Sequence, residues 1–155
     1  MTILSKIETL IEYAKFGMFL CKYHNNETGK LFFPRAYGNY SAANNGGWQQ
    51  MATSIKGYIK ILSGNNFLMG NTVTEIIDLP ELISTGSYAI FGNCSSLKVF
   101  KAPKLQGCGG YFLGNSISLE YVELGAVKSF ATTVLNNDSK LKEFYVKEGT
   151  TSSLY

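Results

Sequence analysis

The stretch that decides the fold is Gly86-Ser-Tyr-Ala-Ile-Phe-Gly-Asn-Cys-Ser-Ser-Leu-Lys-Val-Phe-Lys-Ala-Pro103. Its order of small, apolar and charged positions recurs on both sides at a nearly constant period. The period shows first in asparagines that lie 22 residues apart, namely Asn71, Asn93, Asn115 and Asn137. A period of this length is typical of a solenoid in which each repeat contributes one short strand.

Other positions keep the same step. An apolar residue lies two positions before each asparagine: Met69, Phe91, Leu113 and Leu135. A small or short polar residue follows each one directly: Thr72, Cys94, Ser116 and Asp138. A leucine lies four positions after it in three repeats, and the first repeat is one residue shorter at this point. We interpret the asparagines as structural residues that bond backbone groups in tight turns, since repetition indicates structure rather than catalysis.

The same stretch resembles the repeat unit of BspA-type (Treponema pallidum-type) leucine-rich repeat proteins, whose pattern is roughly Ile-Gly-x-x-Ala-Phe-x-x-Cys-x-x-Leu-x-x-Ile-x-Ile-Pro. The matching positions are Gly86, Phe91, Cys94, Leu97, Phe100, Ala102 and Pro103, whereas Ala89 lies one residue early. The resemblance covers about residues 67–146. Spacing and resemblance together imply an α/β leucine-rich-repeat solenoid, with a single curved parallel β-sheet, about four to five coils and an N-terminal helical cap.

Two regions follow from this interpretation, joined in one compact domain. Residues 1–54 form a cap region, and residues 55–155 carry the repeats with a period of 22–23. Residues 3–16 place apolar side chains at helical spacing, which predicts the capping helix. Residues 19–23 and 30–33 are predicted to be short strands that flank a hairpin turn at residues 25–29.

The segment from Tyr37 to Trp48 lacks periodicity and combines aromatic residues with Asn, Ser and Gly, a composition typical of long adaptable loops. One interpretation is a lid over the first coil with Trp48 buried. The other makes Tyr37, Tyr40 and Trp48 an exposed aromatic platform, and we favour it as the contact if the domain recognises a partner.

Equivalent residues of stacked parallel strands, about 4.8 Å apart, should form columns on the outer face of the sheet. One column contains Glu75, Lys98, Glu120 and Lys142, and a second contains Asp78, Lys101, Glu123 and Tyr145. The alternating charges give each charge an opposite neighbour, which supports the register. Between them lie Ile76, Val99, Tyr121 and Glu143. We treat Val99 and Tyr121 as a second candidate binding strip, with a merely solvated face as the alternative.

Composition and motifs exclude several functions. The net charge of +3 is spread along the chain, which argues against nucleic acid as a partner, and no apolar run is long enough for membrane insertion. The first residues do not read as a signal peptide, although the resemblance implies the cell surface or secretion. Cys21, Cys94 and Cys108 are predicted to be free thiols, and with His24 as the only histidine we expect no metal, no cofactor and no catalytic site.

The expected function is therefore a non-catalytic protein-interaction or adhesion module that binds a protein or a glycan, as the resemblance to bacterial surface proteins implies. The alternative is a structural or assembly segment of a larger surface or phage fibre protein. In either case oligomerisation would use an exposed edge of the solenoid.

Overall fold

In the computed structural model, the chain is described at residues 24–25, 30–33, 39–41, 52–63, 67–85, 91–128 and 134–149. The first three ranges are described by their backbone alone. The predicted helix at residues 3–16 therefore lies outside the described part of the chain. So do Cys21, Tyr37 and Trp48.

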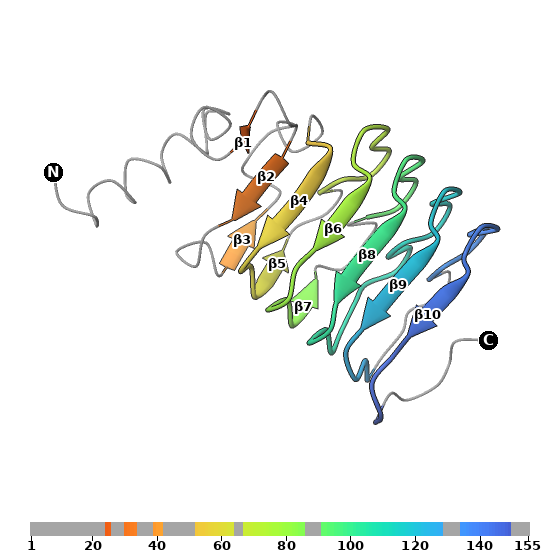
Figure 1. The fold of residues 1–155 in the computed structure, drawn as a ribbon. Coiled ribbons are helices and arrows are strands. Elements are labelled where there is room, and N and C mark those ends of the chain that lie inside the picture. Colours follow the sequence, from red (N-terminus) through yellow and green to blue (C-terminus); the bar gives the residue numbers. More distant parts are fainter. Residues whose placement is uncertain are drawn as a thin grey trace, which may run out of the picture.

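Seven strands form the main sheet, in the order β1-β2-β4-β6-β8-β9-β10 (Figure 1). They are β1 (His24–Asn25), β2 (Lys30–Phe33), β4 (Ser54–Gly57), β6 (Ile76–Asp78), β8 (Val99–Ala102), β9 (Tyr121–Leu124) and β10 (Glu143–Tyr145). Every neighbouring pair from β2 to β10 is parallel. The predicted parallel solenoid is thus confirmed, and it has about four turns.

A second sheet corrects the prediction of a single sheet. It contains β3 (Asn39–Ser41), β5 (Ile61–Ser63) and β7 (Ser84–Thr85), all parallel, and a bridge from Ser84 to Gly107 extends it by one coil. The segments that return from one main strand to the next are stacked at the same spacing as the strands themselves. Where they are extended, their backbone groups can therefore bond to the neighbouring coil.

The strands β1 and β2 are antiparallel, as the predicted hairpin requires, while the predicted first strand at residues 19–23 lies outside the described residues. His24 pairs with Leu31 and Asn25 with Lys30. Asn25 thus belongs to a strand rather than to the turn. The second strand coincides with the predicted residues 30–33 and pairs in parallel with β4.

The core is the interior of the coil stack. Inward residues of the main strands are fully buried, among them Ile77, Phe100 and Val122, and so are Leu97 and Leu119 directly before the strands. Phenylalanines at residues 67, 91, 100 and 112 pack edge to face, with ring centroids 5.0 to 6.0 Å apart. Each large apolar side chain buried in this way contributes about 1.5–3 kcal/mol, so these columns are the main source of stability.

The last coil departs from the predicted burial. Leu141 and Phe144 are only half-buried, and Val146 is 38% exposed. These residues occupy inward positions, but β10 is the last strand in the sheet order. Within the described chain no further coil covers them, which accounts for their partial exposure.

The first repeat is displaced by one residue from the asparagine register. Strand pairing aligns Ile76 with Val99, so Gly70 rather than Asn71 is equivalent to Asn93. Burial agrees with this alignment. Leu68 is fully buried, whereas Met69, which was expected in the apolar column, is 40% exposed.

Hydrogen bonds between coils confirm the displacement. The amide of Gly70 donates to the carbonyl of Gly92 at 3.0 Å, just as the amide of Asn93 donates to Gly114 at 2.8 Å. The backbone at this position is left-handed in each of the four coils in which the structure describes it, with φ of 74° at Gly70, 56° at Asn93, 59° at Asn115 and 62° at Asn137. Glycine and asparagine adopt that conformation most readily, which explains the composition of the column.

Gly125 tests how closely the coils approach one another. A Cβ at this position would meet the backbone of Leu105, with the amide nitrogen 2.6 Å away and the carbonyl oxygen also in contact. Gly125→Ala should therefore lower the free energy of unfolding by about 1–3 kcal/mol, because backbone must shift to admit the methyl group.

Gly107→Ala is the matched control, because a Cβ there meets nothing within 4 Å. It should leave stability within about 1 kcal/mol of the wild type. Urea unfolding followed by circular dichroism measures both variants. Equal losses would show that the packing between these coils is looser than the structure has it.

Candidate functional site

Three columns of outward side chains cross the main sheet in the register expected from the sequence. Val99 pairs directly with Ile76 on one side and with Tyr121 on the other, and Tyr121 pairs with Glu143. The second charged column follows the same pairing: Asp78, Lys101, Glu123 and Tyr145. The first charged column lies directly before the strands: Glu75, Lys98, Glu120 and Lys142. The face is thus a regular grid whose spacing is set by the backbone.

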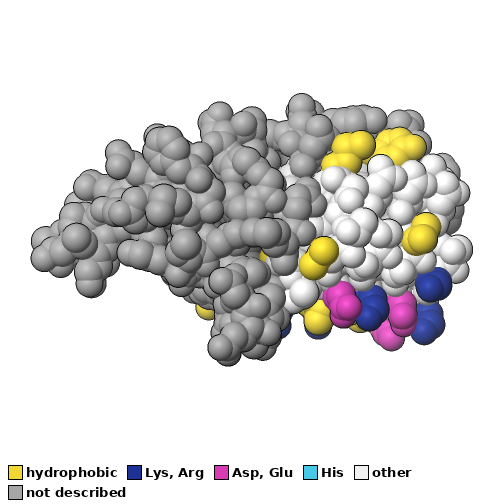
Figure 2. Space-filling view, turned by 90° about the horizontal axis from the view of Figure 1, so that it is seen from above, with side chains coloured by type: hydrophobic (Ala, Val, Ile, Leu, Met, Phe, Trp, Pro, Cys, Tyr) yellow, Lys and Arg dark blue, Asp and Glu magenta, His cyan; other side chains and the backbone are white. Residues whose placement is uncertain are grey.

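Ion pairs join neighbouring residues of the first charged column. Lys98 Nζ lies 3.3 Å from Glu75 Oε2, and Lys142 Nζ lies 2.8 Å from Glu120 Oε2. Figure 2 shows acidic and basic side chains alternating in a row along the lower edge of the molecule in that view. The hydrogen bond from Lys142 lowers the pKa of Glu120 and raises the pKa of Lys142. Because these side chains are largely exposed, the pairs fix the register more than they stabilise the fold.

The second charged column behaves differently from the expected ladder. Among the residues that the structure describes, no ion pair joins Asp78, Lys101 and Glu123. Lys101 instead places its ammonium group 5.2 Å from the centre of the Tyr121 ring. A cation above an aromatic face is attracted by the electron density of the ring. The middle of the face is therefore organised by tyrosine rather than by charge pairing.

At the last two strands, tyrosine and glutamate alternate in a checkerboard, which we call the Tyr–Glu cluster: Tyr121, Glu123, Glu143 and Tyr145. The strand register places Glu143 beside Tyr121, and Tyr145 beside Glu123. The two rings are 5.5 Å apart at their centroids and tilted by 42°. Each hydroxyl donates to the glutamate two residues away on its own strand, at 2.8 Å from Tyr145 to Glu143 and 3.4 Å from Tyr121 to Glu123.

The cluster carries a negative potential that reaches both phenols. The hydrogen bond to Glu143 and the charge of that carboxylate raise the pKa of Tyr145. Burial, followed by the charge of Glu123, raises the pKa of Tyr121. From the sequence, Tyr121 is expected in the binding strip, whereas Tyr145 is expected only as the end of a charged column. The signal was the mirrored pair of strand sequences, Tyr-Val-Glu over residues 121–123 and Glu-Phe-Tyr over 143–145.

The other predicted platform is described at one residue only. The backbone of Tyr40 lies in β3 and pairs with Leu62 of β5. A strand therefore interrupts the segment that was expected to be an aperiodic loop. Tyr40 belongs to the second sheet and the pair Val99 and Tyr121 to the main sheet, while Tyr37 and Trp48 lie outside the described residues.

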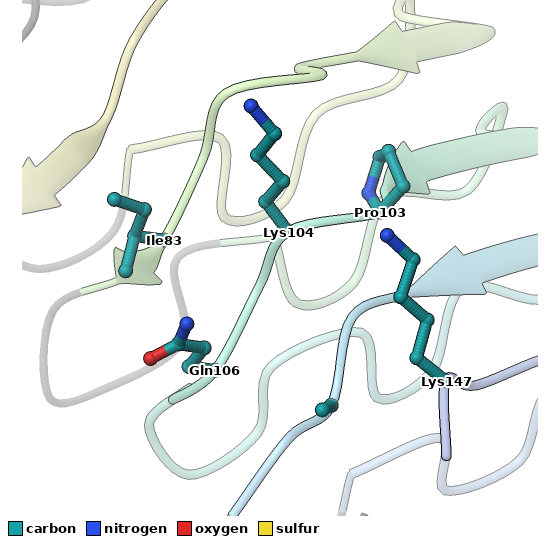
Figure 3. A pocket seen from close by; sticks show the side chains of 6 residues that line it. Ile83, Pro103, Lys104, Gln106 and Lys147 are labelled. Atoms are coloured by element: carbon teal, nitrogen blue, oxygen red, sulfur yellow. The ribbon is translucent and has the colours of Figure 1, made fainter. Parts of the chain in front are cut away.

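A hollow of about 250 Å³ lies where the chain leaves the main strands (Figure 3). Its lining includes Pro103, Lys104 and Gln106 after β8, and Lys147 after β10. Lys104 is held by Glu81, with its ammonium 3.0 and 3.1 Å from the two carboxylate oxygens. The charge of Lys104 is thus already balanced by Glu81.

Cys94 and Cys108 are free thiols, and burial raises the pKa of each to about 12. Thiols that stay protonated at neutral pH are poor nucleophiles and poor metal ligands. Within the described ranges, no group of three or more His, Cys, Asp and Glu side chains is arranged to hold a metal ion. The same part of the chain contains no helix with the length and apolar character needed to cross a bilayer.

The turn column next to the left-handed position contains Asn71, Cys94, Ser116 and Asp138. Asn71 Oδ1 accepts hydrogen bonds from the amides of Val73 at 2.9 Å and Thr74 at 2.6 Å. Asp138 Oδ1 accepts one from the amide of Ser116 at 2.8 Å, while its Oδ2 is buried and accepts none from the described residues. Asp138 thus places a carboxyl group at a position that Asn71, Cys94 and Ser116 fill with neutral side chains. Burial at this position raises the pKa of Asp138 to about 7.

Asp138 predicts a dependence of stability on pH. Its folded pKa lies above the ordinary value of 3.8, so the folded state binds the proton more tightly than the unfolded state does. Stability should fall as pH rises from about 4 to about 7 and then level off. Asp138→Asn removes the charge and should raise the free energy of unfolding at pH 8 by about 1 kcal/mol, a figure reduced for partial exposure.

Urea unfolding at pH 4.5 and pH 8 measures this effect. Asp78→Asn on the outer face is the matched control for the loss of one negative charge. If the two variants follow the same profile, ionisation of Asp138 does not determine the slope.

Comparison with known proteins leaves the site to be interpreted from its own geometry, because no protein-family model, curated protein or solved structure matches this chain.

Proposed function

We propose that this chain is a non-catalytic binding module that recognises a partner through the outer face of the main sheet. The Tyr–Glu cluster is the observation that carries this proposal. It displays two aromatic rings and two carboxylates on paired strands, where the backbone fixes their positions before a partner arrives. Preorganised aromatic side chains provide large contact area at low entropic cost.

Exposure along the middle of the face supports recognition. Ile76 is 37% exposed and Tyr145 is 51% exposed, while Val99 and Tyr121 between them are half-buried. These four residues contribute little to the core, which lies on the opposite face of the same strands. Solenoids commonly bind partners on surfaces of this kind, and exposed apolar groups in a row are typical of interaction sites.

The repeats are, within this proposal, of the BspA-type leucine-rich kind. Buried residues at the family positions support the assignment, since Cys94, Leu97, Phe100 and Ala102 are all fully buried. A role in adhesion or protein interaction at a cell surface accords with such repeats. The second sheet is a departure from the single-sheet arrangement that the resemblance implied. In this respect the fold differs from the one expected from the repeat pattern.

A second candidate function is assembly, favoured by the partial exposure of apolar residues in the last described coil. β10 is the last strand of the main sheet within the described chain, and Val146 beside it is 38% exposed. A parallel strand at an edge is a template for another strand. Light scattering after size exclusion separates the two candidates, because assembly predicts a concentration-dependent mass and recognition alone predicts a monomer.

Binding to glycan and protein arrays tests the proposed function. The wild type should bind at least one class of ligand, and the double variant Tyr121→Ser, Tyr145→Ser should lose that binding by about tenfold or more, since the rings provide the contact. Lys98→Ala, which alters the first charged column, should bind as the wild type does. Equal melting temperatures of the three proteins ensure that recognition is being compared.

Trp48 gives an independent readout, because it is the only tryptophan of the chain. If the ligand changes its emission or protects it from iodide while the serine variant still binds, the contact is the platform of Tyr37, Tyr40 and Trp48. That outcome would overturn the assignment of the site to the main sheet.

A further inference from the structure

We propose, on the basis of the binding function inferred above, that the Tyr–Glu cluster binds cationic side chains, arginine above all, of a partner protein. The cluster is the place where the regular balance of charge on the face ends. Up to β9, the second charged column alternates: Lys56, Asp78, Lys101 and Glu123. The next base would stand at position 145, where the chain has a tyrosine.

The middle column makes the imbalance larger. It is apolar or aromatic at Ile76, Val99 and Tyr121 and then becomes acidic at Glu143. The nearest bases do not neutralise the two carboxylates of the cluster. Lys142 is hydrogen-bonded to Glu120, and Lys101 lies over the Tyr121 ring. Neither Glu123 nor Glu143 forms an ion pair within the described part of the chain.

Hydrogen bonding leaves acceptors rather than donors for a ligand. Both tyrosine hydroxyls donate to an Oε2 atom, of Glu123 and of Glu143 respectively. Each Oε1 atom accepts no hydrogen bond from the residues that the structure describes. A carboxylate can accept several hydrogen bonds, so a ligand that brings N–H donors finds two oxygens on adjacent strands. Arginine presents its donors in a planar fork that suits such a site.

The rings complete the site for a cation. Lys101 already lies against Tyr121, so the cluster itself holds one example of the interaction. Tyr145 is 51% exposed and sits at the outer strand, where an incoming guanidinium can stack on the ring and reach the carboxylates. Aromatic faces beside carboxylates bind cations more strongly than either group does alone. The same negative potential raises the pKa of Tyr145.

The charge of the whole chain makes the inference specific. With a formal net charge of +3, the protein as a whole repels a basic peptide. Binding of such a peptide therefore has to come from a local acidic site rather than from bulk attraction.

A fluorescein-labelled peptide with three arginines separated by Gly-Ser tests the proposal by anisotropy at low and moderate salt. The reference peptide replaces each arginine by citrulline, which has the same shape without the charge. The wild type should bind the arginine peptide at least about tenfold more tightly, with a smaller preference when lysine replaces arginine.

The variant Glu123→Gln, Glu143→Gln keeps the size of both side chains and should weaken binding about tenfold or more. The matched control is Glu75→Gln, Glu120→Gln, which makes the same change of charge in the first column and should alter affinity less than about threefold. Tyrosine absorbance titration adds a second readout, because a bound cation should lower the pKa of Tyr145. All variants are compared at equal thermal stability.

Equal binding of the citrulline peptide, equal losses in the two double variants, or no binding of the arginine peptide would each overturn the cationic partner. The array experiment separates this failure from that of the proposed function. If a neutral glycan or an acidic protein binds and the tyrosine double variant abolishes it, the face is a binding site for a different chemistry. If nothing binds the face, both proposals fail.

Discussion

Hydrogen bonding between equivalent residues of successive coils is the constraint on which the rest of the structure depends. The amide of Glu75 donates to Thr53, that of Lys98 to Glu75, and that of Lys142 to Glu120, at 2.8 to 3.0 Å. Since backbone groups buried inside a stack need partners within the protein, the main strands are bonded to their counterparts one period away. Equivalent residues therefore form columns on both faces of the sheet. The side chains within one column contact one another, so they have to be compatible in size and charge.

The turns show how this constraint selects residues. One turn position is left-handed in four successive coils, and the chain places Gly70, Asn93, Asn115 and Asn137 there. The spacing of asparagines was therefore enough to predict the period and the parallel register of the later strands. It failed by one residue at the first repeat, because Asn71 is an asparagine with another role and both Leu68 and Met69 are apolar. Burial and strand pairing determine the alignment of the first repeat, which the amino-acid sequence alone does not.

Other features depended on contacts that no local pattern encodes. The second sheet uses short return segments such as Ile61–Ser63 and Ser84–Thr85, whose two or three residues are too few to form a recognisable sequence pattern. The partial burial of Phe144 follows from its place in the last described coil and not from its type. The pair Val99 and Tyr121 was predictable because the register was. The positions of the Tyr–Glu cluster follow from the same register, whereas the diagonal contact between the two tyrosine rings and the hydrogen bonds of their hydroxyls do not.

The two charged columns explain why the cluster stands out. Like charges in one column would lie about 4.8 Å apart, so alternation of sign is the arrangement that a stacked face tolerates best. A lysine at position 145 would continue that alternation beside Glu123, and the register would favour it. Tyr145 cannot form this ion pair, and Glu143 places a carboxylate in the middle column, which is otherwise uncharged. The pairing of β10 with β9 through the backbone requires neither residue, although the rings of Tyr145 and Tyr121 contact one another between the two coils. The departure from the ladder leaves two carboxylates and two aromatic rings at this end of the face, which is the arrangement that the proposed binding of cationic side chains requires.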